Sequence, residues 1–150
     1  RQARQGLEAG LNVYVEKPIA INAEDCKLLN QIINKHSGRN LYCGFNRRYS
    51  PHIKFVTDKL KTLPKPFFIN MNINAGQLEE DHWNNDPKIG GGRFISEGIH
   101  FMDLSNHLIM DEIPTEIKYL NSGLKSSEFI NSNWSTILKY QCGSICNSRS

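Results

Sequence analysis

The chain has 150 residues, of which 39% are hydrophobic and 22% are charged, and its formal net charge is +3. These proportions are typical of a globular protein and argue against a disordered chain. The small, scattered positive charge argues against a nucleic-acid-binding protein, and no apolar run approaches the ~20 residues of a membrane span.

The first part of the chain predicts a parallel α/β arrangement. Residues 2–10 suit a short helix, and residues 11–16 suit a short apolar strand. Asn22 and Asp25 form a capping signal for a second helix. We expect the inner face of that helix to comprise Cys26, Leu29, Ile32, Ile33 and His36. A further strand is predicted over residues 40–46, so helices alternate with short apolar strands.

The rest of the chain changes to an α+β pattern. Ser50 and Pro51 predict the start of a helix whose apolar stripe comprises Ile53, Val56, Leu60 and Leu63. In residues 65–76, apolar residues alternate with asparagines, which predicts a strand with one dry and one polar face. We then expect a polar loop over 77–92, a helix from about Arg93 to Met110, and strands over 115–121 and 133–141.

These patterns predict a mixed α/β and α+β fold. The tail of a parallel α/β domain is followed by a domain with a largely antiparallel open sheet and flanking helices. The chain opens without methionine inside a predicted helix, and it closes on residues 139–150, where the last strand is expected to stop abruptly. We therefore expect a piece of a longer protein, truncated at its C-terminal end.

The four cysteines predict free thiols. Their spacing does not match the two-residue spacing of common zinc knuckles or redox motifs. The four residues are Cys26, Cys43, Cys142 and Cys146. Free thiols are typical of a reducing compartment, so we expect a cytoplasmic protein.

Lys17 is the first candidate for chemistry. It follows the strand of residues 11–16, and ligands of open α/β sheets bind outside the carboxyl ends of the strands. One interpretation is that a lysine at this position contacts a ligand. The alternative is a surface ion pair made by Glu16, with Lys17 in solvent.

The stretch "GGGRFISEGIHFMDL", residues 90–104, is the second candidate. Ser96 and His100 are four apart, so a helix places them on one face. One interpretation is an ordinary capped helix with a polar face. Another is a catalytic histidine at the lip of a cleft, with the glycines letting the chain pass close to a ligand. A third is a metal site, although no established ligand pattern matches, and we predict no metal; its ligands would be Glu97, His100, Asp103 and His107.

Taken together, the motifs resemble the glucose–fructose oxidoreductase / inositol dehydrogenase (Gfo/Idh/MocA) family. "EKP" at a strand end, "GFNRRYSP", "GGG" and a "GxHxxD" helix occur in that order, and the resemblance spans about residues 1 to 145. It implies a Rossmann domain that holds NAD or NADP, of which residues 1–20 are the end. Residues 21–150 would form the α/β substrate domain. The variant with Arg93 and Glu97 looks most like a subgroup associated with sugar or nucleotide-sugar metabolism.

The resemblance also implies the roles of individual residues. Lys17 would be the active-site lysine, and His100 the acid/base, because a histidine can accept a proton near neutral pH. Ser96 stands where many members carry an aspartate that orients the imidazole; serine can form a hydrogen bond there but adds no charge. The cofactor side would comprise Glu16, Lys17 and Pro18, and the substrate side Asn46, Arg47, Trp83 and His100.

We therefore expect an NAD(P)-dependent oxidoreductase that acts by hydride transfer on a secondary alcohol of a sugar, polyol or nucleotide-sugar. The G-x-G-x-x-G loop of the family does not occur in this sequence, so the chain alone should bind dinucleotide poorly and be inactive. The alternative is a non-catalytic sugar-binding relative or a truncated remnant. The resemblance further implies a homo-oligomer formed through the open sheet face, with neither nucleic acid nor membrane as a partner.

Overall fold

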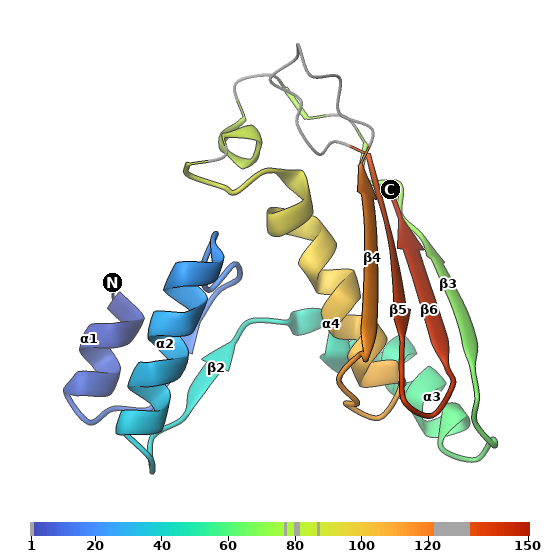
Figure 1. Cartoon of the computed structure of the whole chain (residues 1–150), viewed down its shortest axis with the longest axis horizontal. Helices are drawn as coiled ribbons and strands as arrows, with labels where there is room; N and C mark the ends of the chain where they lie inside the picture. Colours follow the sequence, from blue (N-terminus) through green and yellow to red (C-terminus); the bar gives the residue numbers. More distant parts are fainter. Residues whose placement is uncertain (1, 77, 80–81, 87, 122–132) are drawn as a thin grey trace. The chain divides into compact units, whose positions relative to one another are not determined.

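The computed structural model describes residues 2–76, 78–79, 82–86, 88–121 and 133–150 (Figure 1). The chain divides into two compact units, Arg1–Phe45 and Asn46–Ser150. This division lies downstream of residue 20, where the sequence predicted a boundary. The assignment of residues 1–20 and 21–150 to two domains of a whole enzyme stays a prediction.

The first unit is the parallel α/β arrangement that the sequence predicted. Its elements in chain order are α1 (Gln2–Glu8), β1 (Val13–Val15), α2 (Ala23–Lys35) and β2 (Leu41–Cys43). The two strands pair in parallel, with Tyr14 opposite Tyr42. The Asn22 side chain accepts a hydrogen bond from the Asp25 amide at 2.8 Å, so the predicted cap of α2 is confirmed. The predicted inner face of α2 is wrong at Cys26, which is exposed.

The second unit is built around a four-stranded sheet with the order β3-β6-β5-β4. Its strands are β3 (Phe68–Asn72), β4 (Glu116–Asn121), β5 (Trp134–Lys139) and β6 (Ile145–Arg149). The pairings β4·β5 and β5·β6 are antiparallel, and β3·β6 is parallel. The predicted mixed fold with a largely antiparallel sheet is confirmed.

Strand β6 corrects the prediction for the end of the chain. The sequence suggested that a strand stops abruptly there, yet residues 140–144 form a tight turn and the chain returns as β6. Gly143 has a φ of 84°, and its amide donates to the Tyr140 carbonyl at 3.0 Å. The sequence did not predict this strand, because its cysteine, asparagine and serine residues lack the apolar pattern that a strand inside a sheet usually shows.

Helical segments connect the strands of the second unit. They are the 3₁₀ turns η1 (Asn46–Tyr49) and η2 (Trp83–Asn85), the helix α3 (Pro51–Leu60), the π-helical turn η3 (Phe94–Gly98) and the helix α4 (Ile99–Leu108). The predicted start of α3 is confirmed, but the helix ends at Leu60, and Leu63 is 56% exposed. The expected continuous helix from Arg93 to Met110 is instead one π turn followed by α4.

The core of the second unit lies on the α4 side of the sheet. Ile109, Leu138, Tyr140 and Cys146 are almost fully buried, and Ile69 and Met102 pack against them. In Figure 1, α4 lies along this face of the sheet.

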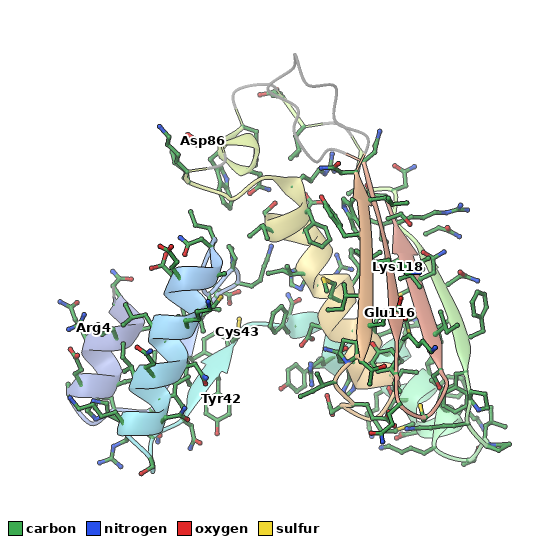
Figure 2. The ribbon with its side chains drawn as sticks, in the orientation of Figure 1. Arg4, Tyr42, Cys43, Asp86, Glu116 and Lys118 are labelled. Carbon is green, nitrogen blue, oxygen red and sulfur yellow. The ribbon has the colours of Figure 1, made fainter. Side chains whose placement is uncertain are left out.

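The other face of the sheet, here called the open face, keeps apolar residues exposed. Phe68 is 69% exposed, Ile137 is 41% and Leu120 is 71%. Glu116 and Lys118 extend from β4 and form an ion pair at 3.3 Å (Figure 2). The open face is therefore part apolar and part polar. None of the helices that the structure describes is long and apolar enough to cross a bilayer.

Candidate active site

Lys17 lies where the sequence predicted it, directly beyond the carboxyl end of a parallel strand. β1 ends at Val15, and the Gly44 amide beyond β2 donates to the Val15 carbonyl at 2.8 Å, so both carboxyl ends meet at one edge. Lys17 is half-buried, and the peptide bond from Lys17 to Pro18 is cis. This is the edge at which α/β sheets bind ligands.

Glu16 shapes the same edge by lying over a glycine. The Tyr14 hydroxyl donates to the Glu16 carboxylate at 3.2 Å. A Cβ atom on Gly44 would lie 2.6 Å from Glu16 Oε2 and 2.8 Å from the Tyr14 hydroxyl oxygen. A side chain at position 44 would therefore force the Glu16 carboxylate and the Tyr14 hydroxyl to move, and glycine leaves them where they are. The edge therefore presents the Glu16 carboxylate, the Tyr14 phenol and the Lys17 ammonium group around the Gly44 backbone, which carries no side chain.

Two structural features require glycine in the run of residues 90–92 before the His100 helix. Gly91 and Gly92 have φ angles of 75° and 85°, which L side chains rarely adopt. A Cβ atom on Gly90 would lie 2.7 Å from both the Asn84 Cα and the Trp83 carbonyl oxygen. One interpretation of the sequence had these glycines pass close to a ligand, and this stays a prediction. The structure shows a close approach of Gly90 to the backbone of η2.

Aromatic packing fixes the orientation of the helix that carries His100. The Phe94 ring lies 4.5 Å from the Tyr119 ring and 5.3 Å from the Trp134 ring. A Cβ atom on Gly98 would lie 2.4 Å from Phe94 Cδ2 and 3.2 Å from Trp134 Cε2. Glycine in "GxHxxD" thus lets the helix lie closely on β5, and the sheet-facing side of the helix is defined by Phe94 and Gly98.

The polar residues of the stretch lie on the rest of the helix surface and are largely buried. His100 is 8% exposed and Ser96 is 0% exposed. The Ser96 hydroxyl donates to the Arg93 carbonyl at 3.2 Å. Arg93 Nε lies 3.3 Å from Glu97 Oε2.

Arg48 is a structural partner of the site that sequence analysis missed. Its guanidinium binds Asp103 with two hydrogen bonds of 2.6 Å and binds Asp111 with a third of 2.6 Å. The hydrogen bonds from Asp103, together with the charges of both carboxylates, raise the pKa of Arg48 further above its ordinary value despite partial burial. Because Asp103 belongs to the "GxHxxD" helix, this ion pair attaches the His100 helix to η1.

The expected substrate-side residues are placed on η1 and η2. Arg47 is exposed, and its guanidinium lies 4.5 Å from the centre of the Phe101 ring, next in sequence to His100. Asn46 is exposed at the start of η1. Trp83 is 51% exposed and stacks on His82 with ring centres 5.7 Å apart. Lys17 belongs to the first unit and His100 to the second, so their approach stays a prediction.

Within the part of the chain that the structure describes, no group of three or more His, Cys, Asp or Glu side chains is arranged to hold a metal ion. Asp103, one of the four residues of the metal interpretation, is bound by Arg48. His107, another, lies 3.6 Å from the Asp111 carboxylate.

Comparison with curated proteins gives two relatives, while no protein-family model matches the chain. The chain is 25% identical over 138 residues to the uncharacterized oxidoreductase YrbE of Bacillus subtilis, covering 84% of this chain and 36% of YrbE. It is 26% identical over 110 residues to the inositol 2-dehydrogenase/D-chiro-inositol 3-dehydrogenase of Lactiplantibacillus plantarum, covering 71% of this chain and 29% of that enzyme. The chain thus spans about a third of the length of these relatives.

The fold is shared with solved structures. An inositol dehydrogenase homolog from Azotobacter vinelandii, in complex with NAD+, superimposes with a TM-score of 0.81 at 21% identity. The superposition covers 99% of this chain and 41% of that protein. The similarity therefore extends over both units of the chain.

Proposed function

We propose, from the premise that this chain is Gfo/Idh/MocA-like in sequence and fold, that the whole protein is an NAD(P)-dependent oxidoreductase. It oxidises or reduces a secondary alcohol of a sugar, polyol or nucleotide-sugar by hydride transfer. The observation that carries the proposal is sequence similarity to an oxidoreductase over 84% of the chain. Lys17 at a strand end and the buried His100 lie within a fold shared with an NAD+-bound homolog.

The edge beyond β1 fits the cofactor side of such a site. Glu16 and Lys17 supply an acceptor and a donor of hydrogen bonds, and Gly44 keeps the backbone beside Glu16 clear of a side chain. Pro18 follows Lys17 directly, across a cis peptide bond. Glu16, Lys17 and Pro18 would hold and orient NAD or NADP, which when bound would supply the hydride chemistry.

His100 and Lys17 perform the proton and charge steps of this mechanism. During oxidation, the His100 imidazole takes the proton of the substrate hydroxyl. The Lys17 ammonium stabilises the negative charge that develops on the same oxygen. Ser96 acts as a positioning residue, because its hydroxyl donates a hydrogen bond to the Arg93 carbonyl and so fixes the backbone ahead of His100.

The substrate side uses residues of η1 and η2. Trp83 offers a half-exposed aromatic ring, which can pack on the apolar face of a sugar ring. Asn46 and Arg47 offer hydrogen-bond donors for hydroxyl groups. Arg47 is held in place by its contact with Phe101, so it approaches the site with less loss of side-chain freedom.

The open face is our proposed contact in a homo-oligomer. Exposed Phe68, Leu120 and Ile137 supply apolar surface that a second copy would cover. The Glu116–Lys118 pair of β4 supplies charges of both signs, as a self-complementary contact needs.

The proposal is tested by turnover of the whole protein, followed through the absorbance of reduced nicotinamide. Lys17→Ala and His100→Ala should each lower kcat by about 10²–10⁴-fold, because each removes a group that acts on the reacting oxygen. The exposed residues Lys27 and His52 provide matched controls, and Lys27→Ala and His52→Ala should leave kcat unchanged.

Near-normal turnover of His100→Ala would remove that residue from the mechanism. If the unmodified protein binds a sugar but reduces no cofactor with it, the non-catalytic alternative is supported instead.

A further inference from the structure

Arg48 contacts the chain of the His100 helix at two points. Its guanidinium donates two hydrogen bonds of 2.6 Å to Asp103, inside α4, and a third of 2.6 Å to Asp111, beyond the end of α4. The side chains of Arg48 and Asp103 are 27% and 12% exposed, so this pair is partly shielded from water. A guanidinium that binds both oxygens of one carboxylate fixes the orientation of that carboxylate as well as its distance.

Asp103 lies about one helical turn from His100. Both residues belong to α4 (Ile99–Leu108), which is regular α-helix and follows the π turn. Residues three apart on an α-helix are neighbours on its surface, with Cβ atoms about 5–6 Å apart. Arg48 therefore holds α4 close to the residue to which the mechanism gives the proton step.

The backbone after α4 adopts a conformation that brings Asp111 to Arg48. Met110 and Asp111 have φ angles of 66° and 59°, in the left-handed region that residues other than glycine rarely adopt. Such a conformation persists only where surrounding contacts hold it. Here the Asp111 amide donates to the Asn106 carbonyl at 2.8 Å, and the Asp111 carboxylate accepts from Arg48. The Arg48 contact therefore stabilises an otherwise unfavourable end of α4.

The residue before Arg48 contacts the same part of α4. The Arg47 guanidinium lies 4.5 Å from the centre of the Phe101 ring, so η1 contacts α4 at positions 101 and 103. A cation above a ring is less directional than two parallel hydrogen bonds to one carboxylate. The orientation of α4 relative to η1 therefore depends more on Arg48 than on Arg47.

We propose that Arg48 is a positioning residue for His100. By holding Asp103 it fixes the rotation of α4 about its axis, and thereby the direction of the imidazole. This inference rests on the proposed function, in which His100 takes the proton of the substrate hydroxyl. That transfer needs the two heavy atoms about 2.6–3.2 Å apart, and a displacement of about 1 Å costs about 10²-fold in rate. Loss of Arg48 should therefore slow turnover more than it weakens substrate binding.

Lys65 provides a matched control, because it also attaches the end of α4 to another segment of the chain. Its ammonium group donates to the Ile109 carbonyl at 3.2 Å and to the Glu112 carboxylate. The Lys65 side chain is 28% exposed, close to the 27% of Arg48. Lys65 thus resembles Arg48 in charge and burial, but it contacts residues beyond α4 and not the turn next to His100.

The test measures kcat and KM of the whole protein with NAD or NADP and either myo-inositol or D-glucose, through the absorbance of reduced nicotinamide. The variants are Arg48→Gln, Arg48→Lys and Lys65→Gln. Thermal unfolding gives a temperature at which each variant is folded, and Arg48→Lys carries the test if Arg48→Gln does not fold. Crystal structures of the same variants show the position of the His100 ring independently of activity.

We expect Arg48→Gln to lower kcat by about 10–100-fold while KM changes by less than about threefold. Arg48→Lys keeps the charge but loses the paired hydrogen bonds, so its kcat should lie between those of Arg48→Gln and the unmodified protein. Lys65→Gln should lower the midpoint of thermal unfolding and leave kcat unchanged. In the crystal structures, the His100 ring should be displaced in the Arg48 variants and keep its place in Lys65→Gln.

Unchanged kcat in a folded Arg48→Gln protein would overturn the proposal. An equal loss of kcat in Lys65→Gln would also overturn it, because both residues would then act only through general stability. If the unmodified protein oxidises neither probe, the proposed function fails for these substrates. The crystal structures then decide separately: a His100 ring displaced only in the Arg48 variants supports positioning by Arg48, and an unmoved ring contradicts it.

Discussion

Replacing Gly98 by alanine tests the packing that holds the His100 helix on the sheet. Two effects oppose each other. Alanine is the better helix former by about 1 kcal/mol, and the φ and ψ angles of Gly98, −60° and −36°, suit any L residue. Against this, the added Cβ would lie 2.4 Å from Phe94 Cδ2. An overpacked site typically costs about 1–3 kcal/mol.

The surroundings of Phe94 decide whether Gly98→Ala stabilises or destabilises the chain. Its ring is held between Tyr119 at 4.5 Å and Trp134 at 5.3 Å, so it has little room to retreat from a new methyl group. We therefore take the upper part of the overpacking range and expect Gly98→Ala to destabilise the chain by about 1–2 kcal/mol net. For a unit of this size, the midpoint of thermal unfolding should fall by roughly 5–10 °C.

Urea and thermal unfolding of the single and double variants measure this effect. In a Phe94→Leu background the ring atoms that the Cβ would strike are gone, so Gly98→Ala should there be neutral or stabilising through helix propensity. If Gly98→Ala is as stable as the unmodified chain in the Phe94 background, the packing argument is wrong.

Three further predictions concern other parts of the structure. Asp103→Asn should cost about 2 kcal/mol by leaving the partly buried Arg48 guanidinium short of a charged partner, whereas Asp58→Asn at an exposed pair should change the urea midpoint little. Asn22→Ala should cost about 1 kcal/mol by removing the cap of α2, visible as lost helical circular dichroism at lower temperature; an unchanged melting curve would contradict it. Burial raises the pKa of the Cys146 thiol to about 11, so the folded state holds this proton more tightly than the unfolded state. The resulting contribution of Cys146 to stability is present below pH about 9 and is lost as the pH rises through about 11. The urea midpoint should therefore fall less over that pH range in Cys146→Ala than in the unmodified chain.

Local signals in the sequence predicted most elements of the fold. The cap formed by Asn22 and Asp25 and the proline at the start of α3 depend on nearby residues, so their chemistry could be recognised without the fold. Strand β6 could not be recognised in this way. Its stability comes from pairing with β3 and β5 on both sides, and its short polar residues carry little of the usual strand signal.

The sequence likewise indicated some residues of the candidate site and not others. The sequence pointed to Lys17 and His100 through ordered motifs, and the structure places Lys17 beyond β1 and His100 at the start of α4. Arg48 escaped sequence analysis because its partner Asp103 lies 55 positions away. Nothing in the spacing of charges along a chain indicates which pairs a fold will join.

The sequence by itself determined the local elements, the order of the motifs and the types of chemical group available, because these depend on short-range backbone preferences and side-chain identity. Tertiary structure alone decided three things: that the glycines of "GGG" and "GxHxxD" are needed for left-handed backbone and close packing, that Arg48 attaches the His100 helix to η1, and that Arg93 is buried beside Glu97. Each depends on which distant surfaces meet, and burial then sets how strongly the charges and hydrogen bonds act.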